Sequence, residues 1–137
     1  MTVKNNIILW DNESTRLCLL SIPSEQQYKY IDGHPCITFG ISYENKNFKG
    51  YDTFTLFDQC YINILNEIKN TYDSLTGAFR IHDMGADTDG YIEFAVQKGI
   101  ALIKGQLGAS FSAHSLKFEF QADQTLIGRL IQAIEQW

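Results

Sequence analysis

Residues 116–137, LKFEFQADQTLIGRLIQAIEQW, decide the fold, because a strand pattern passes there directly into a helix pattern. In the first half apolar residues alternate with polar ones, as expected for a strand with one buried face. These apolar residues are Leu116, Phe118 and Phe120. In the second half apolar residues recur at helical spacing, at Leu126, Ile127, Leu130, Ile131 and Ile134. The pattern predicts a strand that leads into a helix with no loop between them.

Asp123 stands at the change of pattern, just before the first helical residues. Its carboxylate can accept hydrogen bonds from the free backbone N–H groups of the first turn and complement the positive end of the helix dipole. We therefore expect Asp123 to be the N-cap, with Gln124 and Thr125 in the first turn. This role is structural and predicts no chemistry.

A second, longer helix is predicted over residues 57–75, where apolar residues keep helical spacing for roughly five turns. They are Phe57, Tyr61, Ile64, Leu65, Ile68, Tyr72 and Leu75. Thr55 with Asp58 has the spacing of a capping box, and Gly77 stands where a left-handed residue is expected to end the helix.

Four strands are predicted before the long helix and four after it. Their ranges are 5–10, 16–22, 37–41 and 48–54, and then 78–82, 90–96, 100–107 and 115–121. Between the second and third strands lies a turn-rich segment with an Asp32-Gly33 turn, in which Tyr28 and Tyr30 alternate as in a short edge strand. Lys98-Gly99 predicts a tight hairpin turn.

These elements predict an α+β fold, an antiparallel β-sheet of about eight strands with two amphipathic helices packed on it. Short connections between consecutive strands indicate antiparallel pairing, because parallel pairs need crossovers of about a dozen residues or more. The element order is four strands, helix, four strands, helix. The expected core is drawn from Phe57, Tyr61, Ile64, Leu65, Ile68, Leu116, Phe118, Phe120, Leu126, Leu130 and Ile134.

Length and charge restrict the classes of function. A chain of 137 residues with 45% hydrophobic residues is expected to form a single domain over residues 1–137. Sixteen acidic residues against 11 basic ones give a net charge of −5, which argues against a nucleic-acid binder, because such proteins need a basic surface. The charge is compatible with a basic protein partner.

Cysteine usage and hydropathy indicate a cytoplasmic protein that does not enter a membrane. The three cysteines are an odd number without C-x-x-C spacing, so neither a disulfide framework nor a zinc site is predicted. The apolar run over residues 7–10 is too short for the core of a signal peptide. No run reaches the roughly 18 apolar residues that a membrane-spanning helix needs.

The unit at residues 116–137 resembles the WapI-type immunity proteins of bacterial contact-dependent and polymorphic toxin systems. The resemblance is carried by the alternating Leu-x-Phe-x-Phe strand, by Asp123-Gln124-Thr125 and by the terminal amphipathic helix. Leu75-Thr76-Gly77-Ala78, and Gly99 with Gly105 around a short apolar strand, extend it over residues 57–137. It implies a small cytoplasmic protein, not an enzyme, that binds one cognate toxin domain and neutralises it by stoichiometric inhibition.

Residues 82–90, HDMGADTDG, are the densest polar cluster. Aligned as a calcium loop ending in Asp-Gly, the cluster puts Gly85 at the first aspartate position and Val96 at the bidentate glutamate position, so no calcium site is predicted. A solvent-facing loop is expected instead. Asp83, Asp87 and Asp89 on this loop are the predicted contacts for a toxin that carries a basic cleft.

Neither a catalytic site nor a cofactor or metal site is predicted from local motifs. His34, His82 and His114 stand singly without ligand spacing, and there is no G-x-S-x-G elbow or phosphate-binding loop. The alternative is a small enzyme or ligand-binding domain whose site assembles from distant residues, such as a histidine paired with Cys18, Cys36 or Cys60. A deep pocket lined by convergent polar groups would favour that alternative.

Overall fold

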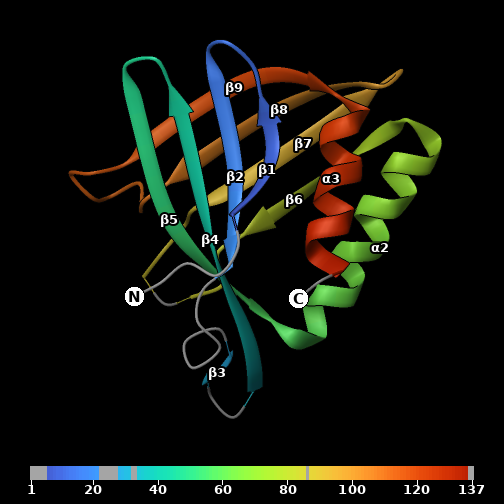
Figure 1. Ribbon diagram of the computed structural model, residues 1–137. Coiled ribbons are helices and arrows are strands. Elements are labelled where there is room, and N and C mark those ends of the chain that lie inside the picture. Colours follow the sequence, from blue (N-terminus) through green and yellow to red (C-terminus); the bar gives the residue numbers. More distant parts are fainter. Residues whose placement is uncertain (1–5, 22–27, 32–33, 86, 136–137) are drawn as a thin grey trace.

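The computed structural model describes residues 6–21, 28–31, 34–85 and 87–135, and within them the chain forms nine strands and two helices (Figure 1). The first sheet contains β1 (Asn6–Asp11), β2 (Thr15–Ser21), β3 (Tyr28–Ile31), β4 (His34–Asn45) and β5 (Phe48–Phe57). The second sheet contains β6 (Thr76–His82), β7 (Tyr91–Gln97), β8 (Ile100–Leu107) and β9 (Leu116–Asp123). The helices are α2 (Asp58–Ser74) and α3 (Gln124–Glu135). The described strand pairs are all antiparallel, so the predicted α+β class is confirmed, with the strands divided between two sheets.

β4 is the central strand of the first sheet because neighbouring strands occupy both of its edges. β5 pairs with residues 36–45 along one edge. The other edge is shared, since β3 pairs with residues 34–37 and β2 with residues 39–45. The short strand predicted from Tyr28 and Tyr30 is therefore confirmed as β3. The predicted Asp32-Gly33 turn lies outside the described residues.

The second sheet is a meander in which β6, β7, β8 and β9 pair in chain order. Lys98 and Gly99 connect β7 to β8 with φ angles of 53° and 80°. Two consecutive positive φ angles are what a two-residue hairpin turn of type I′ requires, and the right-handed twist of the strands favours that turn. The predicted tight turn is confirmed.

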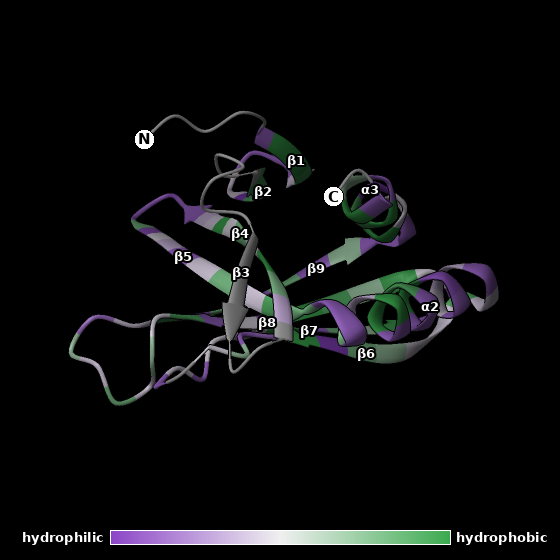
Figure 2. Ribbon diagram, turned by 90° about the horizontal axis from the view of Figure 1, so that it is seen from below, coloured by the Kyte–Doolittle hydropathy of each residue, from purple (hydrophilic) through white to green (hydrophobic). Residues whose placement is uncertain are grey.

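The first sheet and the two helices cover the same face of the second sheet (Figures 1 and 2). α2 and α3 lie side by side and antiparallel over one end of that face, and the first sheet lies across the other end. The residues of the second sheet that point inward are buried and include Phe79, Ile81, Ile92, Phe94 and Ile103. The opposite face of the second sheet stays open to solvent.

The core lies where the two sheets meet and extends under the helices. Phe118 of β9 is only 8% exposed, and its ring stacks on that of Tyr43 from β4 with 4.1 Å between the ring centroids. The predicted core residues that are buried are Ile68, Phe118, Leu126, Leu130 and Ile134, while Tyr61, Ile64, Leu65, Leu116 and Phe120 pack against the core partly buried. Phe57 was also predicted for the core, but it is only half-buried and lies outside this cluster. The first sheet adds a large part that the helix and strand patterns at residues 57–137 did not indicate, centred on Phe39 and Phe54.

The long helix begins and ends within one residue of the predicted range 57–75, but the predicted end signals at Thr55 and Gly77 were wrong. Thr55 belongs to β5 and its hydroxyl contacts that of Thr38 at 3.0 Å, so it does not cap the helix. Pairing with β4 holds β5 extended as far as Phe57, which precedes the helix without a side-chain cap. The left-handed residue at the other end is Leu75, with φ 57°, rather than Gly77.

Asp123 caps α3 as predicted. Its carboxylate accepts hydrogen bonds from the Thr125 amide (2.9 Å) and the Thr125 hydroxyl (2.5 Å). These bonds favour the charged form and lower the pKa of Asp123 below its ordinary value. In the described part of the chain, no helix combines the length and the apolar character that crossing a membrane requires.

Candidate functional site

The predicted acidic loop connects β6 to β7, and Asp83 anchors it to the first sheet. The half-buried Asp83 carboxylate accepts hydrogen bonds from the Thr55 amide (3.0 Å), the Gly85 amide (3.0 Å) and the Thr88 hydroxyl (2.9 Å). The Met84 amide adds a bond of 2.8 Å to the Thr55 carbonyl. Asp83 therefore holds the loop in shape through both of its carboxylate oxygens.

Asp89, at the end of the same loop, fixes a second loop that connects β8 to β9. Its carboxylate accepts hydrogen bonds from the Ser110 amide (2.8 Å), from the Ser110 hydroxyl and from the side chain of the buried Gln106 (2.9 Å). The bond from the Ser110 hydroxyl, followed by that from its amide, lowers the pKa of Asp89 because both favour the charged carboxylate. Asp89 thus carries its charge and holds the β8–β9 loop at Ser110.

Asp87 is the third predicted contact. Its side chain is exposed, and its backbone φ of 56° lies in the left-handed region. The structure therefore brings Asp83, Asp87 and Asp89 together on one loop but gives them different surroundings. Asp87 and Asp89 are exposed, whereas Asp83 is half-buried and bonded within the chain. Their role as partner contacts stays a prediction.

An exposed aromatic residue lies on the loop that Asp89 holds. Phe111 directly follows Ser110 and is 73% exposed, the largest exposed fraction among the large hydrophobic residues described. The same loop forms one side of a hollow of about 380 Å³, and Phe48 and Tyr51 of β5, both exposed, form the other side. The Tyr51 ring itself lies over Gly40 of the first sheet. We call Phe48, Asp87, Asp89 and Phe111 the loop surface.

Outside the acidic residues, local sequence patterns indicated little of the loop surface. Phe111 stands alone among small and polar residues in GASFSAHS, a pattern typical of an exposed loop. Asp52 was also missed because it lies inside a strand, yet its carboxylate accepts a hydrogen bond of 2.8 Å from the Gly108 amide. That bond connects the first sheet to the β8–β9 loop across 56 residues of sequence.

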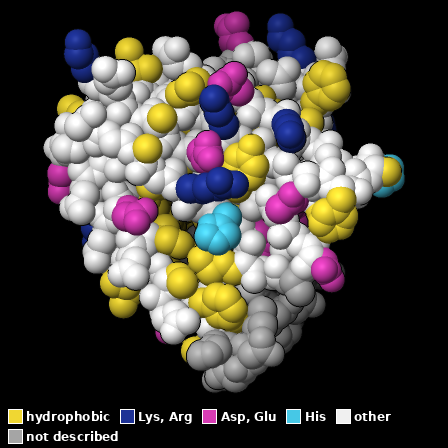
Figure 3. Space-filling view, turned by 180° about the vertical axis from the view of Figure 1, so that it is seen from behind, with side chains coloured by type: hydrophobic (Ala, Val, Ile, Leu, Met, Phe, Trp, Pro, Cys, Tyr) yellow, Lys and Arg dark blue, Asp and Glu magenta, His cyan; other side chains and the backbone are white. Residues whose placement is uncertain are grey.

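A second candidate surface is the open face of the second sheet. Strand register aligns Arg80, Glu93, Lys104 and Glu119 in one row across all four strands. Arg80 pairs with Glu93 at 3.2 Å and Lys104 with Glu119 at 3.6 Å. The row is visible in Figure 3 as a line of alternating basic and acidic side chains. We call these four residues the charged row.

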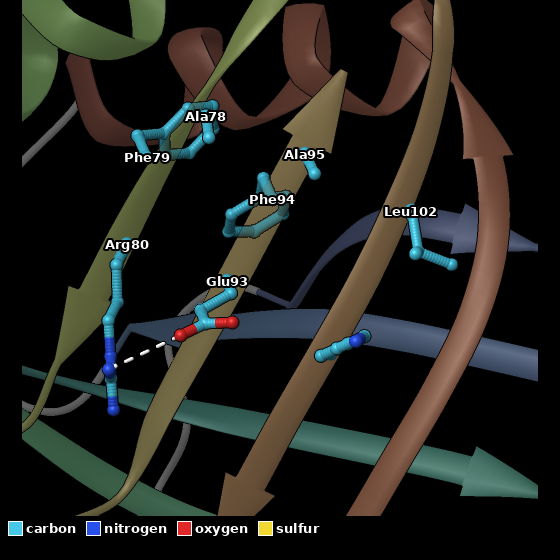
Figure 4. Close-up of a pocket in the computed structure, with 8 residues that line it drawn as sticks. Ala78, Phe79, Arg80, Glu93, Phe94, Ala95 and Leu102 are labelled. Carbon is cyan, nitrogen blue, oxygen red and sulfur yellow. Dashed lines mark ion pairs between the residues drawn. The ribbon is translucent and has the colours of Figure 1, made fainter. Parts of the chain in front are cut away.

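The neighbouring row on the open face contains mainly apolar residues, two of which are alanines. Register aligns Ala78, Ala95 and Leu102 there, with Gln121 at the end. The two alanines leave a hollow of about 420 Å³ between Leu102 and the charged row (Figure 4). Leu102 is 38% exposed and Ile100, further along β8, is 52% exposed. Large apolar side chains therefore face solvent on a rigid sheet.

The three cysteines named for a cysteine–histidine site differ in exposure, and Cys60 on α2 is partly exposed. Cys18 and Cys36 are buried in the first sheet, and burial raises the pKa of the Cys18 thiol, which disfavours the thiolate that a nucleophile needs. His82 and His114 are exposed on β6 and on the β8–β9 loop. Within the described ranges, no three His, Cys, Asp or Glu side chains gather closely enough to hold a metal ion.

Comparison of the chain with protein-family models, with curated proteins and with solved structures found no match.

Proposed function

We propose that the protein is an immunity protein that binds one cognate toxin domain and neutralises it by stoichiometric inhibition. The observation that carries this proposal is the loop surface, where the exposed Phe111 and the exposed carboxylates of Asp87 and Asp89 lie on two loops that the Asp89–Ser110 bonds join. Aromatic side chains dominate the energetics of many protein interfaces, and loops on a rigid scaffold are where binding residues concentrate. The resemblance of residues 116–137 to WapI-type immunity proteins supports the same class of function.

The residues in and around the loop surface have different roles in this proposal, and each role follows from the chemistry of the side chain. Phe111 supplies the apolar anchor that fills a pocket on the partner. Asp87 and Asp89 supply negative charge at the rim, which favours a basic partner surface and speeds association with it. Asp83 acts indirectly by holding the loop, because its carboxylate is bonded to Thr55, Gly85 and Thr88.

Pre-ordering supports tight binding by this surface. A loop that must be ordered on binding costs free energy, and a loop already held in place does not. The Asp89 bonds to Ser110 hold the loop that carries Phe111, and the Asp52 bond to Gly108 holds its first residue. The surface therefore meets a partner without prior rearrangement.

The net charge of −5 suits a toxin that acts on nucleic acid. Such a toxin needs a basic cleft for its own substrate, and an acidic protein is attracted to that cleft over long range. Occupying the cleft blocks the substrate without any chemical step by the inhibitor.

Co-expression in a bacterial host tests the function. In the family that the chain resembles, immunity genes lie directly downstream of genes for large toxins, so the probe is the C-terminal domain encoded directly upstream. We expect this domain to stop growth alone and to be tolerated when the chain is co-expressed at equal or higher level. Protection by far less than one equivalent of the chain would indicate turnover and favour an enzyme instead.

A further inference from the structure

We infer that the open face of the second sheet is the contact surface for a second copy of this chain, related by a two-fold axis that runs parallel to the strands between β7 and β8. The inference uses different residues from the loop surface and does not depend on the proposed function. It rests on the order of charges in the charged row and on the shape of the apolar row beside it.

The charged row is complementary to itself under this two-fold axis. Its signs alternate from β6 to β9 as plus, minus, plus, minus. When two copies meet face to face, the axis places β6 over β9 of the second copy and β7 over β8. Arg80 then faces Glu119 of the second copy, and Glu93 faces Lys104. Each of these contacts occurs twice in the dimer, as the symmetry of such an interface demands.

The apolar row fits the same arrangement. The axis places Leu102 of one copy over Ala95 of the other, because these residues are directly paired between β8 and β7. Leu102 is the projecting side chain and Ala95 lies in the hollow. Each copy therefore inserts its leucine into the hollow of the other. Ile100 lies over Gln97 of the second copy and extends the apolar contact, since these two residues are also paired.

Net charge favours this face over the rest of the molecule as the meeting surface. Two chains that each carry −5 repel one another, and the repulsion is smallest where the local charge is neutral. The charged row holds two basic and two acidic residues, so it contributes no net charge. The acidic excess of the chain lies on other surfaces, including the loop surface.

The small area of the open face indicates a weak dimer. Four strands about 4.8 Å apart and about seven residues long cover about 440 Å² before side-chain relief is counted. Specific interfaces begin at about 600 Å² per partner. This flat area lies below that range, so the dimer is expected to be weak and to dissociate on dilution.

Sedimentation velocity over a concentration series tests the inference with the full chain. We expect the mass to rise from 15.6 kDa towards twice that value as concentration increases. Arg80→Glu should weaken association at least about tenfold, because it puts two acidic residues opposite each other at two symmetric places. Leu102→Glu should weaken it similarly by placing a charge in the hollow.

The double variant Arg80→Glu/Glu119→Arg is the decisive measurement. It restores opposite charges between the copies, since the new carboxylate at position 80 would face the new guanidinium at position 119 of the second copy. It also makes both cross-strand pairs within each chain like-charged. Recovery of association in the double variant therefore supports contact between copies and excludes an effect that acts only within one chain.

Matched controls separate this face from general changes in charge or hydropathy. Arg16→Glu removes an exposed ion pair with Asp11 in the first sheet, and Ile62→Glu removes an exposed isoleucine from α2. Both should leave association unchanged, and circular dichroism should verify the fold of every variant. A constant mass of one chain, equal association of Arg80→Glu and the unmodified chain, or no recovery in the folded double variant would overturn the inference.

Discussion

The carboxylate of Asp89 accepts hydrogen bonds from both the amide and the hydroxyl of Ser110, 21 residues later in the chain. This contact joins the β6–β7 loop to the β8–β9 loop and fixes the position of Phe111. The loop surface therefore depends on one pairing of residues that are distant in sequence.

Asp89→Ala should release the β8–β9 loop while the rest of the fold is kept. The Ser110 amide then loses its acceptor, so hydrogen exchange at residues 108–115 should become faster. Ser110→Ala is the matched control, because it removes the hydroxyl bond but keeps the bond from the amide. Exchange in this loop that is equal in Asp89→Ala and the unmodified chain would show that other contacts order it.

Acid should destabilise the protein through Asp89 and Asp123. The pKa of both carboxyl groups is lowered from the ordinary value of 3.8 in the folded chain. Their contribution to stability is therefore fully present above pH 3.8 and is lost as pH falls through the lower folded pKa. Thermal unfolding between pH 5 and pH 2 should show a shallower decrease in the Asp89→Asn/Asp123→Asn variant. An equal decrease in both proteins would contradict this account.

Phe118→Ala should be among the most destabilising single changes. The ring is 8% exposed, stacks on Tyr43 and occupies the space above Gly105, where a β-carbon would collide with it. Loss of a buried phenylalanine costs about 3–5 kcal/mol in the free energy of unfolding. Phe48→Ala is the control, since Phe48 is 62% exposed and its loss should change unfolding little. Similar unfolding curves for Phe118→Ala and Phe48→Ala would contradict the assignment of Phe118 to the contact between the two sheets.

Asp123→Ala should lower the free energy of unfolding by about 1 kcal/mol with the fold retained, as is usual for loss of an N-cap. Chemical denaturation measures the change. Thr125→Val removes only the hydroxyl donor and should cost less, because the Thr125 amide still reaches the Asp123 carboxylate. Unchanged stability of Asp123→Ala would contradict the assignment of Asp123 as the cap.

Local patterns predicted the elements well where one face of each is buried. The strand with Phe118 and Phe120, the Asp123 cap and the Lys98-Gly99 turn all follow from spacing within a few residues. The Thr55 cap of the long helix was wrong because pairing of β5 with β4 extends the strand to Phe57, and that pairing depends on a neighbour in space.

The division into two sheets could not be predicted from the sequence, because it depends on whether strands before the long helix pair with strands after it. The candidate surfaces were hidden for the same reason. Arg80 and Glu119 are each an ordinary exposed residue in a strand, and only the register of four strands aligns them. The acidic loop was visible as a cluster of aspartates, but the bonds that separate Asp83 from Asp87 in role come from Thr55 and Thr88.

The hydrogen bonds that Asp83 accepts also decide which substitutions can test the loop surface. Reversing the charge of Asp83 would disrupt the loop, because its carboxylate accepts bonds from three groups of the chain. Asp87→Lys and Phe111→Ala change exposed side chains and leave those bonds in place. Ile62→Ala on α2 is the matched control for an exposed apolar residue.

Calorimetric titration of the purified upstream toxin domain with this chain tests the central claim most directly. The account predicts saturation at one chain per toxin domain, an affinity loss of at least about 2 kcal/mol for Phe111→Ala, slower association for Asp87→Lys and no change for Ile62→Ala. Absence of binding would contradict the proposed function. Binding that Phe111→Ala and Asp87→Lys leave unchanged would contradict the assignment of the loop surface as the contact.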